Sequence, residues 1–314
     1  MKTKLVAIVG PTAVGKTALG VALAKALDGE VINGDASQVY KGMDIGTAKI
    51  TADETEGVPH YLIDIVSPEQ TYTAFDFQTD ARRQIADISA RGKLPIIVGG
   101  TGLYIKAATY DYRFADEPET NQSMREAYQT LASLEGPAAL HERLRSVDPG
   151  AAEAIHPNNI KRVIRALEKY ETTGLRAEER DEQTAGPLYD LVTVGLTMDR
   201  DKLYQRINDR VDQMVAAGLE KEARALYDRG LFERTALQSI GYKEWLGYFT
   251  GAMSFAETVD LIKKHTRRFA KRQYTWFNHQ MDVKWFDISH PSDRSQNFSK
   301  IIQFVAGKLE ERSK

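Results

Sequence analysis

The sequence predicts an α/β fold in which a parallel sheet is flanked by helices, with an inserted all-helical subdomain. In the first third of the chain, segments of helical periodicity alternate with short apolar runs at 5–9, 30–32, 61–66 and 94–98. Apolar runs of this length, separated by helices, are typical of parallel strands that are buried on both faces. From about residue 113, helical patterns follow one another with no convincing strand, which predicts the insertion.

The first predicted strand leads directly into a Gly-x-x-x-x-Gly-Lys-Thr loop. The loop consists of Gly10, Pro11, Thr12, Ala13, Val14, Gly15, Lys16 and Thr17. A helical pattern follows at 18–27, so the strand, loop and helix of a P-loop occur in the required order. The glycines let successive backbone N–H groups point into one concavity, and the helix N-terminus adds positive potential. The core is therefore predicted to be P-loop NTPase-like and to bind a di- or triphosphate.

Two side chains of this loop are suited to phosphate and metal binding. We expect Lys16 to reach an outer phosphate oxygen and the Thr17 hydroxyl to bind a Mg²⁺ ion that bridges two phosphates. Mg²⁺ is therefore the expected cofactor, with Thr17 as its protein ligand.

Two further loops are predicted to reach the same edge of the sheet. The strand at 30–32 is followed by a turn that contains Asp35, and the strand at 94–98 leads to Thr101. A helix is predicted between them, at about 73–91, with Gly92 as its stop. In a parallel sheet, ligands gather at the carboxyl ends of the strands. The P-loop, Asp35 and Thr101 are therefore expected to converge on one crevice.

The predicted boundaries assign 1–112 and 196–314 to the catalytic core and 113–195 to the helical insertion. The clearest helix of the insertion begins after Pro157, with Asn158 or Asn159 as its N-cap, and ends at Gly174.

This helix also carries a basic cluster. Val163 and Ile164 belong to its apolar stripe, whereas Lys161, Arg162 and Arg165 gather away from that stripe. Charge alone leaves two interpretations open, a solvated helix face or a surface for nucleic acid.

The C-terminal part begins with a predicted strand at 191–196 and continues with helices. Leu203, Ile207, Val211 and Val215 fall four residues apart and predict one buried helix face. Gly218 is expected to break that helix, and the pattern resumes at 219–227, which carries Arg224. The segment at 263–273 is the most basic of the chain and suits either phosphates or solvent. A last helix, at about 295–311, carries an apolar docking stripe.

Composition narrows the class of protein. The chain has 314 residues, of which 42% are hydrophobic, so it can bury a substantial core. The absence of cysteine excludes disulfides and cysteine-based zinc sites. No apolar run approaches the roughly 20 residues of a membrane span, so we expect a cytoplasmic protein with no membrane partner. The net charge of −2 means that any nucleic-acid binding must rest on local basic clusters.

Several P-loop reactions fit the sequence poorly. No Asn-Lys-x-Asp element for guanine recognition is present, and the strand at 94–98 ends in Gly99 and Gly100 rather than in an acidic Mg²⁺ ligand. Nucleotide hydrolysis is therefore disfavoured. Two possibilities remain: a small-molecule kinase with Asp35 as the base, or a transferase whose leaving group is the bound polyphosphate.

A set of short motifs, in order along most of the chain, resembles the bacterial tRNA dimethylallyltransferases. The matching stretches are 10–17, 35–40, 43–49, 98–104, 156–158, 239–244 and 270–276. Ala36 departs from the family pattern, in which serine follows the aspartate.

The resemblance implies a reaction and the residues that perform it. The family transfers a dimethylallyl group from dimethylallyl diphosphate to the N6 atom of the adenosine 3′-adjacent to the anticodon of tRNA. By this resemblance, Asp35 is the base that accepts the N6 proton and Thr101 orients the base or the leaving group. The P-loop and Arg224 are implied to bind the diphosphate.

The resemblance also implies a set of tRNA-binding residues. These are Asp35, Ala36, Ser37, Gln38, Thr101, Arg125, Lys161, Arg162, Val163, Ile164, Arg165, Gln238, Ser239, Ile240, Gly241, Tyr242 and Lys243. The insertion would then grip the anticodon stem while the core holds the loop. A P-loop small-molecule kinase, an isopentenyltransferase for free adenine nucleotides and a non-catalytic RNA-binding protein remain as alternatives, and we expect a monomer.

Overall fold

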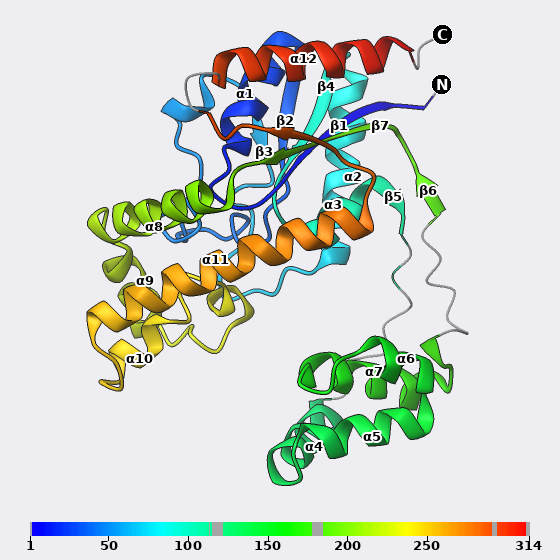
Figure 1. The fold of residues 1–314 in the computed structure, drawn as a ribbon, viewed down its shortest axis with the longest axis vertical. Coiled ribbons are helices and arrows are strands. Elements are labelled where there is room, and N and C mark those ends of the chain that lie inside the picture. The colour runs from blue at the N-terminus through cyan, green and yellow to red at the C-terminus, as the bar shows by residue number, and fades with distance from the viewer. Residues whose placement is uncertain (1, 113, 115–121, 178–184, 291–293, 312–314) are drawn as a thin grey trace. The chain divides into compact units, whose positions relative to one another are not determined.

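The computed structural model describes residues 2–112, 114, 122–177, 185–290 and 294–311 (Figure 1). The chain divides into two compact units, one formed by Met1–Asp111 and Ala185–Lys314, the other by Tyr112–Thr184. The expected boundary at 195 is therefore wrong. Residues 190–195 belong to a strand that pairs along its length with the first strand of the core, so they cannot be part of the insertion.

The larger unit is built on a six-stranded sheet whose order is β3-β2-β4-β1-β7-β8. Its strands are β1 (Lys4–Val9), β2 (Gly29–Asn33), β3 (His60–Tyr61), β4 (Leu94–Val98), β7 (Asp190–Thr197) and β8 (Lys284–Asp287). Every neighbouring pair in this sheet is parallel, and β1 lies between β4 and β7. A parallel central strand must be buried on both faces, which explains the continuous apolar run of β1.

Alternate residues of β1 contact two different helical layers. Leu5, Ala7 and Val9 belong to a core shared with α2 (Ala74–Ala90), α3 (Gly102–Thr109) and α11 (Phe255–Gln280). Val6 and Ile8 belong to a second core, shared with α1 (Lys16–Ala26) and α12 (Arg294–Glu311). Figure 1 shows these two layers on opposite faces of the sheet. The predicted α/β class with a flanked parallel sheet is confirmed.

A helical extension of this unit follows β7. It contains α8 (Arg200–Ala216), α9 (Leu219–Asp228), the short 3-10 helix at Thr235–Gln238 and α10 (Trp245–Phe249), and α11 packs against α8. The predicted break at Gly218 is confirmed, since this residue has a φ of 104° between α8 and α9. In α11, Ser254 and Glu257 form a reciprocal capping box, which explains where this 26-residue helix begins.

Two strand predictions differ from the structure. The expected strand at 61–66 ends at Tyr61, because Leu62 and Asp64 have positive φ angles of 62° and 54° that cannot continue a strand. The strand β8 was not predicted, since its four residues carry too little pattern.

The smaller unit is helical. Its helices are α4 (Gln122–Leu134), α5 (Pro137–Val147), α6 (Pro149–Ala154) and α7 (Ile160–Thr173). Tyr128, Leu140, Leu144 and Leu167 are among the residues that form its separate core. The helix predicted after Pro157 is confirmed as α7, with Asn159 at its N-cap and Gly174 at its C-cap in the left-handed conformation. Two short strands of the larger unit, β5 (Tyr110–Asp111) and β6 (Ala185–Pro187), pair where the chain leaves and re-enters it.

Candidate phosphate-binding and transfer site

Three loops meet at the carboxyl edge of the sheet, as the sequence predicts. The amide of Gly34, after β2, donates to the Val98 carbonyl at the end of β4, at 2.8 Å. The amide of Gly99 donates to the Ile8 carbonyl of β1 at 3.1 Å. Thr101 N in turn donates to the Gly34 carbonyl at 3.2 Å. Because these bonds join neighbouring strand ends, the P-loop, the Asp35 turn and Thr101 share one edge.

The P-loop adopts a conformation that requires glycine. Gly10 has a φ of 142°, and a Cβ atom built on it would lie 2.6 Å from the carbonyl oxygen of Leu196. Gly15 has a φ of 106° and immediately precedes α1. The loop therefore packs tightly on β7 at Gly10, while Gly15 turns the chain into the helix α1.

Lys16 lies at the start of α1, and its ammonium donates to the Pro11 carbonyl of the same loop at 2.8 Å. Burial lowers the pKa of Lys16 to about 8; the nearby Asp35 opposes this shift, and Arg210 adds to it. A partly desolvated ammonium inside the loop is well placed to bind an anion.

Asp35 is held by its own turn. Its Oδ1 atom accepts a hydrogen bond from Ser37 N at 2.9 Å, and its backbone amide donates to Asn33 Oδ1 at 3.1 Å. The Thr101 hydroxyl oxygen accepts from Ala36 N at 3.0 Å, so the loops after β2 and β4 are joined directly. The Oδ2 atom of Asp35 and the hydroxyl hydrogen of Thr101 remain for a ligand.

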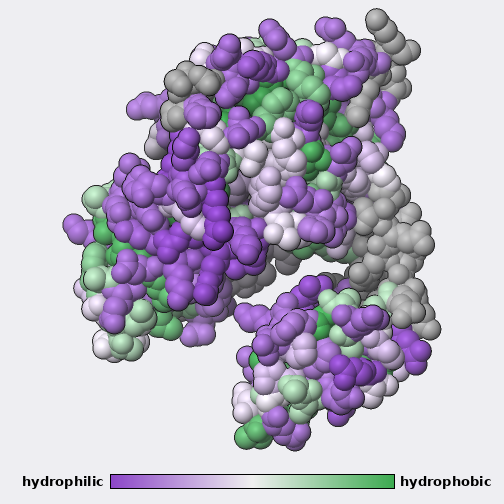
Figure 2. Space-filling view, in the orientation of Figure 1, coloured by the Kyte–Doolittle hydropathy of each residue, from purple (hydrophilic) through white to green (hydrophobic). Residues whose placement is uncertain are grey.

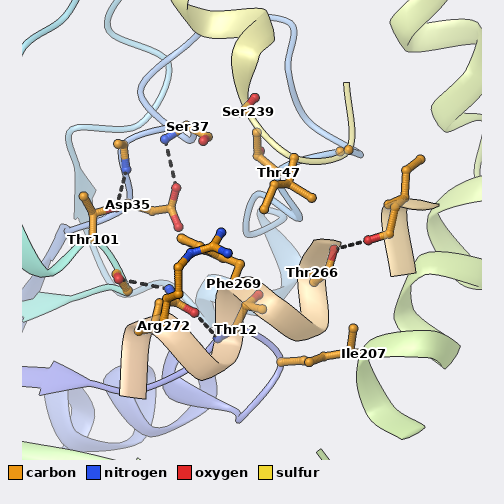
Figure 3. Close-up of a pocket in the computed structure, with 18 of the residues that line it drawn as sticks. Thr12, Asp35, Ser37, Thr47, Thr101, Ile207, Ser239, Thr266, Phe269 and Arg272 are labelled. Carbon is orange, nitrogen blue, oxygen red and sulfur yellow. Dashed lines mark hydrogen bonds between the residues drawn. The ribbon is translucent and has the colours of Figure 1, made fainter. Parts of the chain in front are cut away.

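Asp35 lies where two cavities meet. One, of about 530 Å³, is lined by Asp35, Thr101, the α8 residues Ile207 and Met214, and the α11 residues Phe269, Arg272 and Trp276; we call it the α11 chamber (Figure 3). The other, of about 970 Å³, is lined by Asp35, Lys16, Thr17, Arg206 and Arg210 among others; we call it the P-loop chamber. Thr12, Asp35 and Arg210 line both chambers.

The structure corrects the assignment of Arg224. Its guanidinium lies 3.8 Å from the centroid of the Phe249 ring and 3.5 Å from Glu220, and it lines neither chamber. Arg210 on α8 lies there instead, and burial lowers its pKa while Asp35 and Glu54 oppose that shift. The signal was present in the sequence: Arg210 comes three residues after Ile207, on the same side of the helix.

α11 supplies site residues that sequence reasoning left unassigned. Gln273 accepts from Thr12 N and donates to the Gly100 carbonyl, both at 2.9 Å. Within the basic run at 263–273, Lys263 pairs with Asp212 at 2.6 Å and Arg267 donates to Asn208 at 2.5 Å. Arg272 instead lines the α11 chamber, so the basic run divides between helix packing and the site.

The segment 238–243 forms another wall of the α11 chamber. Gln238, Ser239, Ile240 and Gly241 line the chamber, and Lys243 is exposed. Tyr242 is fully buried, and its hydroxyl donates to Glu222 at 2.6 Å. A buried side chain cannot contact tRNA, so that assignment of Tyr242 is wrong.

The structure also places the residues around Asp35. Ala36 and Ser37 line the α11 chamber, whereas Gln38 lines the P-loop chamber and donates to the carbonyls of Thr47 and Ala48 at 3.1 and 3.3 Å.

In the helical unit, the residues assigned to tRNA divide into two groups. Lys161, Arg162 and Arg165 are exposed on α7. Val163 and Ile164 are 0% and 5% exposed in the core of the unit, so their assignment to tRNA contact is wrong. Arg125 makes hydrogen bonds of 2.8 to 2.9 Å to both carboxylate oxygens of Glu168 and ties α4 to α7.

The fold and the site define a P-loop α/β protein in which the chamber at the P-loop meets the α11 chamber, with the Asp35 carboxylate lining both. Comparison with known proteins identifies the particular family. The family model for IPP transferase matches residues 38–280. The chain therefore belongs to the IPP transferase family.

Relatives match along the whole chain. The chain is 54% identical over 310 residues to the tRNA dimethylallyltransferase of Geobacillus thermodenitrificans, covering 98% of each. It is 50% identical over 310 residues to that of Bacillus subtilis, again covering 98% of each.

Solved structures of proteins from the same family are also similar to this chain. The crystal structure of the full-length tRNA isopentenylpyrophosphate transferase from Bacillus halodurans has 50% identity and a TM-score of 0.77, covering 99% of this chain and 98% of that one. A eukaryotic dimethylallyltransferase acting on tRNA has 31% identity and a TM-score of 0.83, with 99% and 80% covered. Within the described residues, no helix is both long and apolar enough to cross a membrane.

Proposed function

We propose that this protein transfers a dimethylallyl group from dimethylallyl diphosphate to N6 of the adenosine 3′-adjacent to the anticodon of tRNA and releases diphosphate. The observation that carries the proposal is the position of Asp35 at the junction of the two chambers. The names of the relatives, which match over nearly all of the chain, support the same reaction.

The P-loop chamber suits the diphosphate of the donor. Four cationic side chains line it, together with the N-terminus of α1: Lys16, Lys49, Arg206 and Arg210. Lys49 is paired with Asp44 and Asp64, which leaves the other three as the candidates for the diphosphate. Negative charge on the leaving oxygen grows as the allylic carbon–oxygen bond breaks, so donors held in place here lower the barrier.

The same chamber fits a Mg²⁺ ion. Thr17 follows Lys16 at the start of α1, its side chain is exposed, and it lines the chamber. The described residues contain no cluster of three or more acidic, histidine or cysteine side chains that could hold a metal alone. This donor set fits Mg²⁺, which commonly binds through few protein ligands, substrate phosphates and water. When bound, Mg²⁺ would neutralise charge on the diphosphate.

The α11 chamber suits the adenine and the apolar tail of the donor. Phe269, Trp276, Ile207 and Met214 give it aromatic and aliphatic walls. An adenine that reaches this chamber has left the anticodon stack, which costs a few kcal/mol and is easiest in a single-stranded loop. The apolar walls offset part of that cost by stacking.

Asp35 is the proposed base. The N6 lone pair is delocalised into the adenine ring, so N6 is a weak nucleophile until its proton is taken. As the bond from N6 to the allylic carbon forms and the bond from that carbon to the diphosphate oxygen breaks, the N6 proton moves to Asp35 Oδ2. Such a base contributes about 10² to 10⁴-fold in rate. Thr101 orients the adenine. Its hydroxyl oxygen accepts from Ala36 N, so its hydroxyl hydrogen can be donated to the base.

The helical unit is the proposed contact to the anticodon stem. Lys161, Arg162 and Arg165 form its exposed basic cluster on α7, and ion pairs to phosphates provide most of the sequence-independent affinity of proteins for nucleic acids. We further propose that the protein acts as a monomer in the cytoplasm, where unmodified tRNA is available.

The test uses purified protein, Mg²⁺, radiolabelled dimethylallyl diphosphate and an unmodified anticodon stem-loop. Label should enter the RNA with wild-type protein and with Asp260→Asn, a matched change at an exposed position of α11, but fall at least about 100-fold with Asp35→Asn. Free AMP and ATP form parallel arms. Label in AMP but not RNA would identify a nucleotide-modifying isopentenyltransferase. ATP turnover without prenyl transfer would identify a kinase. RNA binding that needs neither substrate nor Asp35, with no transfer to any acceptor, would identify a non-catalytic RNA-binding protein.

A further inference from the structure

The carboxylate of Glu222, on α9, binds three successive backbone amides of another segment. Its Oε2 atom accepts from Asp44 N at 3.0 Å and from Ile45 N at 2.9 Å, and its Oε1 atom accepts from Gly46 N at 3.0 Å. Hydrogen bonds to an ionised acceptor are roughly twice as strong as neutral ones. One side chain therefore fixes the start of the loop 44–49 from a position 176 to 178 residues away in sequence.

The same carboxylate also binds the buried Tyr242. Its Oε1 atom accepts from the Tyr242 hydroxyl at 2.6 Å, and burial, followed by the negative charge of Glu222, raises the pKa of Tyr242. Gly46 lies flat against the Tyr242 ring, since a Cβ atom there would be 2.5 Å from ring atom Cζ. Glu222 thus joins the loop 44–49 to the segment 238–243.

Both joined segments are walls of the site. Gly46 and Thr47 line the α11 chamber, and Gln238 to Gly241 line it as well (Figure 3). The loop also lines the P-loop chamber, through Asp44, Ile45, Thr47, Ala48 and Lys49. At the other end of the loop, Gln38 donates to the carbonyls of Thr47 and Ala48. The loop is therefore held between Glu222 on one side and the Asp35 turn on the other. Glu222 itself lines neither chamber.

We propose that Glu222 is a positioning residue for the acceptor: by holding the loop 44–49 and the segment 238–243 together, it sets the width of the chamber that receives the target adenine. This proposal rests on the proposed function for the identity of the acceptor, but not for the structural role of Glu222.

Loss of this carboxylate should loosen the loop without unfolding the protein. Asp44 is exposed, and Ile45 and Gly46 are partly exposed, so water can replace the carboxylate at their amides. A loop that is released from Glu222 but still held by Gln38 samples more conformations, of which few shape the chamber. A small displacement is enough to lower kcat/KM about 10 to 100-fold.

The experiment compares three variants of the full chain. Glu222→Gln keeps the size of the side chain but presents an NH₂ group, which cannot accept, to at least one set of amides. Tyr242→Phe keeps the ring against Gly46 and removes only the hydroxyl. Glu220→Gln, on the same helix but paired with Arg224, is the matched control.

Hydrogen exchange of the segment 43–49 is measured first, because it needs no substrate. Exchange there should accelerate at least about tenfold in Glu222→Gln, less in Tyr242→Phe and not in Glu220→Gln, with α1 and the sheet unchanged. In the transfer assay, kcat/KM for the stem-loop should fall about 10 to 100-fold in Glu222→Gln. The equilibrium affinity for dimethylallyl diphosphate is measured alongside, because the loop 44–49 also lines the P-loop chamber. A loss of donor affinity as large as the loss of kcat/KM for the stem-loop would contradict a role for Glu222 that is specific to the acceptor.

Each result has a distinct meaning. Unchanged exchange in Glu222→Gln would overturn the proposal whatever the reaction is. Faster exchange with unaltered kcat/KM for RNA would overturn the positioning role while leaving the contact. A wild-type protein that transfers no prenyl group would contradict the proposed function, and the exchange result would still decide the structural role.

Discussion

Gln273 of α11 accepts a hydrogen bond from the amide of Thr12, in the P-loop, at 2.9 Å. The same side chain donates to the Gly100 carbonyl, also at 2.9 Å, and is 5% exposed. A single amide group therefore ties the phosphate loop to the loop after β4.

We predict that Gln273→Ala lowers the free energy of unfolding by about 1–3 kcal/mol, because the Thr12 amide and the Gly100 carbonyl lose their buried partner. Urea unfolding measures this change. Gln280→Ala, at the exposed end of the same helix, is the control and should stay within about 0.5 kcal/mol of wild type. Equal destabilisation by both variants would contradict a specific role for Gln273.

Arg210, rather than Arg224, should bind the donor. Arg210→Ala removes a cation that lines both chambers, so we predict at least a tenfold weaker affinity for dimethylallyl diphosphate. Arg224→Ala removes a stack on Phe249 and should leave that affinity unchanged. Isothermal titration of the two variants decides between the positions, and a weaker donor affinity in Arg224→Ala alone would restore the assignment made from resemblance.

Donor binding should weaken as the pH rises through about 8, the pKa to which burial lowers Lys16 in the free protein, because the diphosphate needs its ammonium form. The effect on stability has the opposite sign. Between pH 8 and the ordinary Lys value of 10.5, the unfolded chain holds a proton that the folded protein has released, so the free energy of unfolding rises with pH.

The measurement is donor affinity and urea unfolding at pH 7 and pH 9.5. Lys16→Met removes the titrating ammonium. Lys25→Met, at the far end of α1, is the control, because it leaves Lys16 in place. If Lys16→Met retains the wild-type pH dependence, another group is responsible.

Exposed basic residues and buried apolar residues of α7 should affect different properties, the first RNA affinity and the second stability. Replacing Lys161, Arg162 and Arg165 together by Ala should weaken stem-loop binding and reduce the dependence of log affinity on log salt by about 2–3, since each phosphate contact contributes up to about 0.9. Folding of the helical unit should not change, because these side chains are exposed.

Ile164→Ala should lower the stability of the helical unit rather than act through direct loss of an RNA contact. It empties space in the core of the helical unit, and we predict a loss of about 2–5 kcal/mol in the stability of that unit. Hydrogen exchange of α4, α5 and α7 reports this loss, and fluorescence anisotropy reports stem-loop affinity. A salt slope that is unchanged in the triple variant would show that α7 does not contact phosphates.

Patterns of neighbouring residues in the sequence were enough to predict the P-loop and the strands β1, β2, β4 and β7. They also predicted that Asp35 and Thr101 lie close together at the carboxyl ends of these strands. Each of these depends on neighbouring residues: a glycine that permits a turn, a strand that must be apolar, or a loop that follows a strand end. The helix after Pro157 and its end at Gly174 were predictable for the same reason.

Only the tertiary structure decided which basic and buried residues belong to the site. Arg210 and Arg224 lie on the consecutive helices α8 and α9, yet only Arg210 lines the P-loop chamber, whereas Arg224 stacks on Phe249. The bonds of Glu222 to Gly46 and of Gln273 to Thr12 span 176 and 261 residues. Such contacts arise when distant segments pack together, and no pattern within either segment encodes its partner.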